Sequence, residues 1–185
     1  MKIKIVSILL LLNSSLFSQI SEEQEIYHFI NSTINKSTSE FNLKDKFGEY
    51  TYSVEYLKTY FSDSIFSQKD RDTFLLQLKK NENFVWNEDF IPNSKVIKSR
   101  EIKKIFRKKI ILAKLRKEKG WDKFNKKYEK CLTTFSIPLF SANMQYCIFF
   151  QWTQCDYLAG GGSLKIYINK AGKWEFYDIL MTGMS

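Results

Sequence analysis

The sequence contains few of the residues that interrupt folded structure and few of those that bind metals. Only two prolines and seven glycines occur among its 185 residues, which argues against a disordered or low-complexity chain. His28 is the single histidine, and this excludes a multi-histidine metal site. The sequence shows no nucleophile–base pair, metal-ligand spacing or cofactor motif, so we predict no catalytic residue, no metal and no cofactor.

The sequence also lacks an apolar run long enough to cross a bilayer. Its most apolar stretch, Ile5–Leu12, is much shorter than the roughly 20 residues of a helical span. Lys2 and Lys4 precede this stretch, and small polar residues follow it as far as Ser18. These three parts are typical of a secretory signal peptide. We therefore predict cleavage after Ser18 and export of residues 19–185 to the periplasm or the extracellular space, with no transmembrane segment in the mature chain.

Positive charge is abundant but unevenly placed. The chain has 29 Lys and Arg against 20 Asp and Glu, a net charge of +9. Residues 95–130 hold sixteen basic and four acidic residues, so this segment carries +12 and the rest of the chain −3. Such a segment suits anionic lipid, lipopolysaccharide or extracellular DNA, while export excludes cytoplasmic nucleic acid as a partner. The alternative is the solvated face of a lysine-rich helix, and we predict only weak association with an anionic envelope surface.

Helical periodicity dominates residues 19–130. It predicts helices over residues 21–35, 67–80 and 99–119, a short helix at 121–128 and another at 54–61. Ser67 is the expected N-cap of the second helix, and Gly120 is expected to end the third. The third helix has an apolar face and a basic one, and the candidate anion-binding face consists of Lys104, Arg107, Lys108 and Lys114.

A strand period of two replaces the helical period after residue 131. Four strands are predicted around residues 133–139, 146–152, 164–168 and 174–176, with a turn at Lys170-Ala171-Gly172-Lys173 before the last. A two-residue turn at Ala142-Asn143 would pair Leu139 with Tyr146 and Phe135 with Phe150. We therefore predict a single α+β domain over residues 19–185, with N-terminal helices packed on a C-terminal four-stranded antiparallel meander.

The strand pattern also bears on the three cysteines, Cys131, Cys147 and Cys155. An odd number leaves at least one thiol free or bonded to another chain. In the expected register, Cys131 points to the Phe135 face, whereas Cys147 and Cys155 point to the opposite face. The sequence therefore predicts no disulfide within the chain.

The segment from Gly120 to Ile179 resembles a family of uncharacterised exported bacterial proteins. The shared pattern is a W-x-x-F-x-x-x-Y helix, an S-x-x-x-F strand, a glycine-rich stretch and a K-x-G-K-W strand. The matching residues are Trp121, Phe124, Tyr128, Ser136, Phe140, Gly160, Gly161, Gly162, Gly172, Lys173 and Trp174. The resemblance implies export and an α+β plan, and it implies no activity. Many members of the family carry a pair of cysteines in the loop before the glycines, where this chain has Cys155 and Ala159.

One loop is the candidate ligand-binding site: Asp156, Tyr157, Gly160, Gly161 and Gly162. The glycines precede a strand and lack the following G-K-[ST] of a phosphate loop, so they are expected to form the turn between the second and third strands. Tyr157 is expected to be exposed. Our leading hypothesis is a non-enzymatic exported binding or envelope-associated domain. The alternatives are a hydrolase of envelope material that acts through carboxylates such as Asp156, and a polyanion-binding domain that uses the basic helix 99–119.

Overall fold

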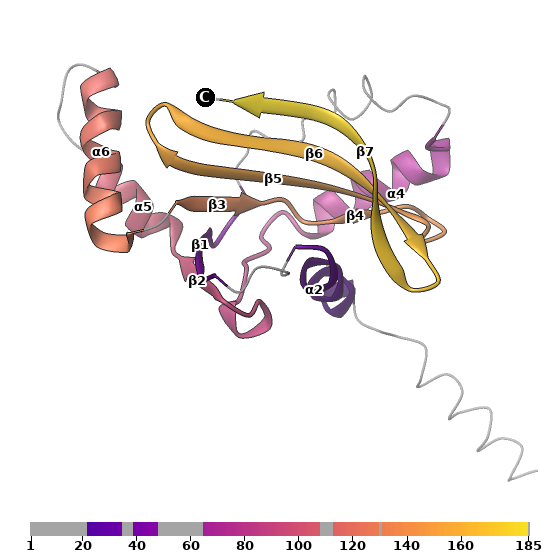
Figure 1. The fold of residues 1–185 in the computed structure, drawn as a ribbon. Helices are drawn as coiled ribbons and strands as arrows, with labels where there is room; N and C mark the ends of the chain where they lie inside the picture. The colour runs from indigo at the N-terminus through magenta and orange to yellow at the C-terminus, as the bar shows by residue number, and fades with distance from the viewer. Residues whose placement is uncertain (1–21, 35–38, 48–64, 108–112, 130, 185) are drawn as a thin grey trace, which may run out of the picture.

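A mixed β-sheet with helices beside it forms the framework of the protein (Figure 1). The computed structural model describes residues 22–34, 39–47, 65–107, 113–129 and 131–184. The helices in these ranges are α2 (Glu22–Thr33), α4 (Gln68–Lys80), α5 (Ser99–Phe106), α6 (Ala113–Tyr128) and the short 3-10 helix η1 (Glu88–Phe90). None of the helices in these ranges combines the length and the hydropathy that crossing a bilayer requires. The predicted short helix at 54–61 lies outside the described residues.

The sheet has seven strands and is larger than the predicted meander. Its strands are β1 (Phe41–Lys44), β2 (Ser94–Ile97), β3 (Leu132–Phe135), β4 (Leu139–Phe140), β5 (Tyr146–Asp156), β6 (Ala159–Lys170) and β7 (Lys173–Met184). They are ordered β2-β1-β3-β5-β6-β7, and β4 pairs with β5 beside β3. The predicted α+β class is confirmed, whereas the predicted four-stranded sheet is too small. β1 runs parallel to both β2 and β3, so two strands from the segment predicted to be helical complete the sheet.

The two additional strands have little sequence signal because each is only four residues long. In β1 the polar Asn42 is as well buried as its neighbour Leu43, which removes the expected alternation of apolar and polar residues. Only pairing with distant segments reveals such strands. Leu43 pairs with Val96 on one side and with Thr133 on the other.

The predicted strand over 133–139 is divided into β3 and β4. Ser136 interrupts it by forming two bonds with Phe150: its backbone N–H donates to the Phe150 carbonyl, and its Oγ accepts the Phe150 N–H, both at 2.9 Å. Pro138 follows and has no N–H to donate to a ladder. The strand therefore cannot continue in one register.

The predicted pairing of this strand with β5 is wrong by one residue before the break and by two residues after it. Leu139 pairs with Ile148 rather than Tyr146, and Phe135 pairs with Gln151 rather than Phe150. The connection is longer than two residues, since the Ser141 N–H donates to the Tyr146 carbonyl at 2.9 Å and Met144 takes a positive φ of 57°. A shift by one residue at β3 reverses the faces of its side chains relative to β5.

The last hairpin agrees with the sequence. Lys170 pairs with Lys173 across a two-residue turn, in which Ala171 and Gly172 both have positive φ, 52° and 84°. Asn169 supports the turn by accepting the Gly172 N–H at 2.8 Å through its Oδ1. The turn residues of a type I′ hairpin thus stand where the sequence places them.

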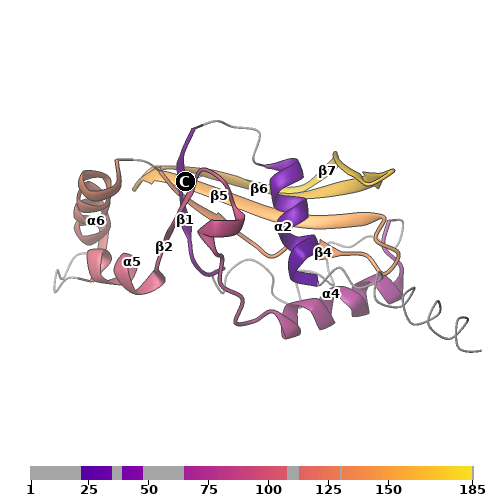
Figure 2. The ribbon, with the colours of Figure 1, turned by 90° about the horizontal axis from the view of Figure 1, so that it is seen from below.

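The first predicted helix is confirmed as α2, and its apolar stripe is buried. Phe29 is fully buried, with its ring 5.4 Å from that of Phe149, 5.1 Å from that of Tyr167 and 5.6 Å from that of Trp174. His28 is exposed on the other side of the helix. Figure 2 shows α2 crossing the sheet, with α4 beside β4.

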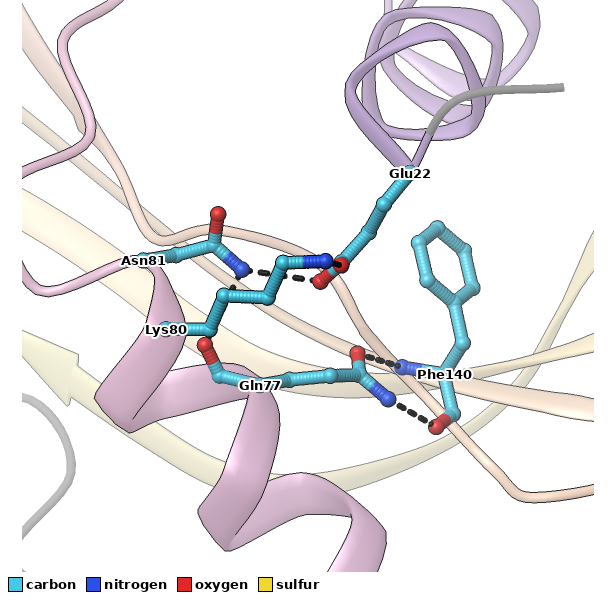
Figure 3. Close-up of polar contacts among 5 residues, drawn as sticks. All are labelled: Glu22, Gln77, Lys80, Asn81 and Phe140. Carbon is cyan, nitrogen blue, oxygen red and sulfur yellow. Dashed lines mark hydrogen bonds and ion pairs between the residues drawn. The ribbon is translucent and has the colours of Figure 1, made fainter. Parts of the chain in front are cut away.

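The second predicted helix, α4, has the bounds that the sequence indicates and is tied to β4. Ser67 caps it in a capping box with Asp70. The Gln77 side chain pairs with both backbone groups of Phe140, donating to its carbonyl at 2.7 Å and accepting its N–H at 3.0 Å (Figure 3). Glu22 of α2 binds the neighbouring Lys80 and Asn81, so polar side chains connect α2, α4 and the sheet (Figure 3).

The third predicted helix is in fact two helices, α5 and α6, and Gly120 lies inside α6 instead of ending a helix. A Cβ atom at Gly120 would lie 2.4 Å from the Phe106 ring, so glycine is needed for α5 and α6 to approach each other. The chain leaves α6 at Glu129, which takes a positive φ of 58°. The two helices form what we call the α5–α6 lobe, at one end of the sheet (Figure 1).

Candidate functional site

A disulfide joins Cys131 and Cys155, contrary to the prediction from the sequence. Leu132 pairs with Gln154, so Cys131 and Cys155 stand opposite each other on neighbouring antiparallel strands, with Cα atoms 4.0 Å apart. The prediction failed because it assumed the Phe135–Phe150 pairing. In the observed register, odd-numbered residues of β3 and β5 share a face.

The remaining cysteine, Cys147, is a fully buried free thiol in β5. Burial raises the pKa of Cys147 well above its ordinary value, so the thiol stays protonated and unreactive at neutral pH. The odd cysteine count is thus explained within one chain, by one disulfide and one core thiol.

The α5–α6 lobe contacts the sheet beside this disulfide. Asn125 of α6 donates through its Nδ2 to the Cys155 carbonyl at 3.0 Å. The lobe has its own core, separate from the main one: Ile97, Trp121, Phe124, Tyr128 and Leu132. At the other end of the lobe, the buried Asp45 beyond β1 accepts the Ser99 backbone N–H at 2.8 Å and so caps α5.

The candidate ligand loop lies at this junction. Tyr157 was expected to be exposed, but it is half-buried and packs against the core of the lobe. Asp156 is exposed, and its carboxylate accepts the Tyr157 N–H at 2.6 Å. Tyr157 therefore helps to attach the lobe to the end of β5, whereas the carboxylate of Asp156 makes a local contact.

The three glycines are in β6 and not in the predicted turn between the second and third strands, which consists of Tyr157 and Leu158. Gly162 faces Trp152, and a Cβ atom there would lie 2.2 Å from the Gln151 carbonyl oxygen. A Cβ atom at Gly183 of β7 would lie 3.1 Å from the same indole ring. Trp152 therefore covers the backbone at Gly162 and Gly183. Close packing, and not ligand binding, explains the glycine at position 162.

The carboxylates of the sheet region are engaged locally. Glu175 pairs with Lys170 at 2.9 Å, and Asp178 accepts the Ile179 N–H at 2.7 Å. Among the described residues, no group of three or more His, Cys, Asp and Glu is placed to hold a metal ion. Two cavities lined by described residues, of about 480 and 370 Å³, are at α5 and between α2 and the end of α4, away from these carboxylates.

The candidate anion-binding face is only partly described. Lys104 and Arg107 are both exposed, but α5 ends at Phe106, so Arg107 follows the helix instead of continuing it. Lys108 and the side chain of Lys114 lie outside the described residues. The predicted basic face on one long helix is therefore replaced by exposed basic residues distributed over a two-helix lobe.

The lobe contains a polar cluster that was not predicted from the sequence: Glu101, Lys127 and Tyr128. The Tyr128 hydroxyl donates to Glu101 at 2.7 Å, and Lys127 pairs with the same carboxylate at 3.3 Å. Both bonds lower the pKa of Glu101, and the bond from Tyr128 has the larger effect. The ammonium groups of Lys95 and Lys127 lie 5.6 and 4.9 Å from the centre of the Tyr128 ring. The sequence did point to Tyr128, through the helical spacing of Trp121, Phe124 and Tyr128, but this spacing indicated packing and not a polar contact.

No known family, no curated protein and no solved structure matches this chain. The class that the fold itself defines is an α+β protein with a mixed seven-stranded sheet.

The disulfide predicts a large effect on stability. Replacing both Cys131 and Cys155 by serine opens a link between residues 24 apart in sequence, and the free energy of unfolding should fall by about 3–4 kcal/mol. Urea unfolding of the oxidised protein and the double variant measures this change. A thiol assay on denatured, oxidised protein should detect Cys147 alone, and three reactive thiols would contradict the assignment.

The glycines allow a matched comparison. Gly162→Ala should lower the free energy of unfolding by at least about 2 kcal/mol, because its Cβ would overlap the Gln151 carbonyl. Gly161→Ala should change it by less than about 1 kcal/mol, because its nearest neighbour would be 3.5 Å away. Equal effects of the two substitutions would show that close packing at Gly162 is not what distinguishes them.

Proposed function

We propose that this is an exported, non-enzymatic domain that associates with the cell envelope. The observation that carries the proposal is the disulfide between Cys131 and Cys155. Disulfides persist in the periplasm and outside the cell and are rare in the cytoplasm, so this bond agrees with a signal peptide over residues 1–18. The fully buried Cys147 is protected from mispairing in the same environment. The resemblance of residues 120–179 to exported proteins points in the same direction.

A compact build suits such a domain. We infer that the N-terminal helices cover one face of the antiparallel strands β5, β6 and β7, and the contacts of Phe29 with Phe149, Tyr167 and Trp174 support this. With the disulfide, this packing would stabilise a small domain outside the reach of cytoplasmic chaperones.

The hydrolase hypothesis receives little support from the described geometry. Two carboxylates that act as acid and base need a shared cleft and different environments. Asp156 is exposed at the end of β5, where its carboxylate accepts the N–H of the adjacent Tyr157. Glu175 is paired with a lysine on the β6–β7 hairpin.

Association with anionic envelope material is the second part of the proposal, and the charge of the lobe favours it. The last turn of α5 exposes Lys103 and Lys104, and Arg107 just after the helix is exposed as well. On α6, Lys126 and Lys127 are exposed. Glu101, the acidic residue of α5, is bound to Tyr128 and Lys127. The positive charge of the basic residues around Glu101 is therefore largely not neutralised within α5.

Export is tested by following the chain in a bacterial host. The protein should be recovered from the periplasm or the medium with Gln19 as its first residue, and a variant without residues 1–18 should stay in the cytoplasm. N-terminal sequencing of the fractionated protein measures this. Recovery of Met1 in the exported fraction would refute the signal peptide, and cytoplasmic retention of the full chain would refute export.

Anion association is tested with vesicles. The mature protein should sediment weakly with vesicles rich in anionic phospholipid at low salt, and sedimentation should fall steeply toward physiological salt. Replacing Lys103, Lys104 and Arg107 by alanine should weaken partitioning by roughly a hundredfold at low salt, at about 1 kcal/mol per basic residue.

The control variant removes the same charge elsewhere, by replacing the exposed Lys69, Lys79 and Lys173 with alanine. It should bind much as the unmodified protein does. Equal losses in the two variants would assign binding to net charge, and tight binding that survives physiological salt would contradict the weak association proposed here.

A further inference from the structure

A cavity of about 370 Å³ lies between the first turn of α2 and the end of α4. Its lining residues come from α2, from the C-terminal end of α4 and from the loop that follows: Glu22, Glu23, Lys80, Asn81, Phe84 and Val85. This volume is in the lower part of the range of small-molecule sites, which is about 300–1,000 Å³. The cavity is therefore large enough for one small ligand.

Three polar residues of this cavity hold one another in place and keep unused bonding capacity. Glu22 binds Lys80 through one carboxylate oxygen and accepts an Asn81 Nδ2–H at 2.9 Å through the other (Figure 3). The same Nδ2 also donates to the Gln77 carbonyl at 3.0 Å. The Asn81 Oδ1 atom accepts no bond from a described residue, and the Lys80 ammonium has two further N–H groups to donate. A hydrogen-bond acceptor and a donor therefore remain available in the lining.

Glu23 gives the cavity an uncompensated negative charge. Glu22 and Lys80 neutralise each other, whereas Glu23 forms no hydrogen bond or ion pair with a described residue. Burial raises the pKa of Tyr27 above its ordinary value, and the charge of Glu23 raises it further, so the carboxylate of Glu23 is close to the Tyr27 hydroxyl. The centre of the Tyr27 ring lies 6.1 Å from that of Phe84. The charge of Glu23 is therefore near an aromatic part of the lining.

Phe84 and Val85 form the apolar part of the lining. The Phe84 ring is half-buried and lies edge-to-face with Trp86, with 4.9 Å between the ring centres, and Val85 is 46% exposed. A sugar has the matching surfaces, because its hydroxyl groups donate and accept hydrogen bonds while its ring has an apolar C–H face. An amino group on the sugar adds a positive charge, which both a carboxylate and an aromatic ring attract.

We propose that this cavity binds an amino sugar with a free amino group, as a unit of an envelope polysaccharide. The ammonium group of the sugar pairs with Glu23. Its hydroxyl groups donate to Asn81 Oδ1 and accept from Lys80 Nζ, and its C–H face packs on Phe84 and Val85. The inference rests on the proposed function only in that export brings the domain to such a polysaccharide.

The test follows the amide resonances of the mature, oxidised protein by NMR while a sugar is added. A glucosamine trisaccharide, at about pH 6 where its amines are protonated, should shift the resonances of residues 22–23 and 80–85 in a saturable way. Its N-acetylated form has the same hydroxyl groups and ring faces but no charge, and it should bind roughly tenfold more weakly. Absence of saturable binding, shifts confined to other residues, or equal binding of the two forms would each overturn the proposal.

Glu23→Gln removes the charge and keeps the size of the side chain, so it should weaken binding of the glucosamine trisaccharide by roughly tenfold and change binding of the N-acetylated form little. Glu82→Gln is the matched control, because Glu82 is also exposed and follows Asn81 in the chain but does not line the cavity. It should bind both sugars as the unmodified protein does. Unchanged binding in Glu23→Gln, or equal losses in the two variants, would contradict the role of Glu23 and the proposal with it.

A further variant separates this site from the anion association proposed above. The alanine variant of Lys103, Lys104 and Arg107 should bind the glucosamine trisaccharide as the unmodified protein does, because these residues do not line the cavity. Failure of sugar binding would therefore leave the vesicle result unaffected, and failure of vesicle binding would leave the sugar result unaffected. Loss of sugar binding in this variant would assign the sugar to the α5–α6 lobe and overturn the proposal.

Discussion

The register between β3 and β5 is the constraint on which the rest of this structure depends. Phe135 lies opposite Gln151 and Ser136 opposite Phe150, and the register shifts only after Ser136, whose Oγ accepts the Phe150 N–H in place of its own carbonyl. One consequence is the disulfide, because Cys131 and Cys155 then face each other. Another is the position of the α5–α6 lobe, since α6 leads directly into β3 and holds the Cys155 carbonyl through Asn125. A different register would separate the cysteines and move the lobe.

Polar side chains in the positions of backbone partners are a recurring solution in this fold. Gln77 bonds to both backbone groups of Phe140 as a neighbouring strand would, and Asp45 replaces the missing side-chain cap of α5. Each such bond satisfies a backbone group that would otherwise be left without a partner near the core, which would cost about 1–3 kcal/mol. Aromatic rings such as Phe29 fill the volume between the elements, while these polar bonds fix where the helices sit.

The candidate site illustrates how packing and ligand binding give the same sequence signal. Gly160, Gly161 and Gly162 beside Asp156 and Tyr157 could have formed a ligand loop, but Gly162 leaves room for Trp152 and Tyr157 packs on the lobe. The proposed function therefore rests on two features, the disulfide and the distribution of positive charge. The disulfide bears on the compartment, and the segregated positive charge bears on the partner.

The sequence by itself determined the features that depend on neighbouring residues. It located α2 and α4 with the Ser67 cap, the strands of the C-terminal third, and the Ala171-Gly172 turn, because periodicity, capping and positive φ are local properties. Only the tertiary structure decided the short strands β1 and β2, the break between α5 and α6, the register at β3 and hence the disulfide. Each of these depends on contacts between residues far apart in the chain, such as Leu43 with Thr133 and Gly120 with Phe106. A one-residue irregularity that local patterns do not reveal is enough to reverse which side chains meet.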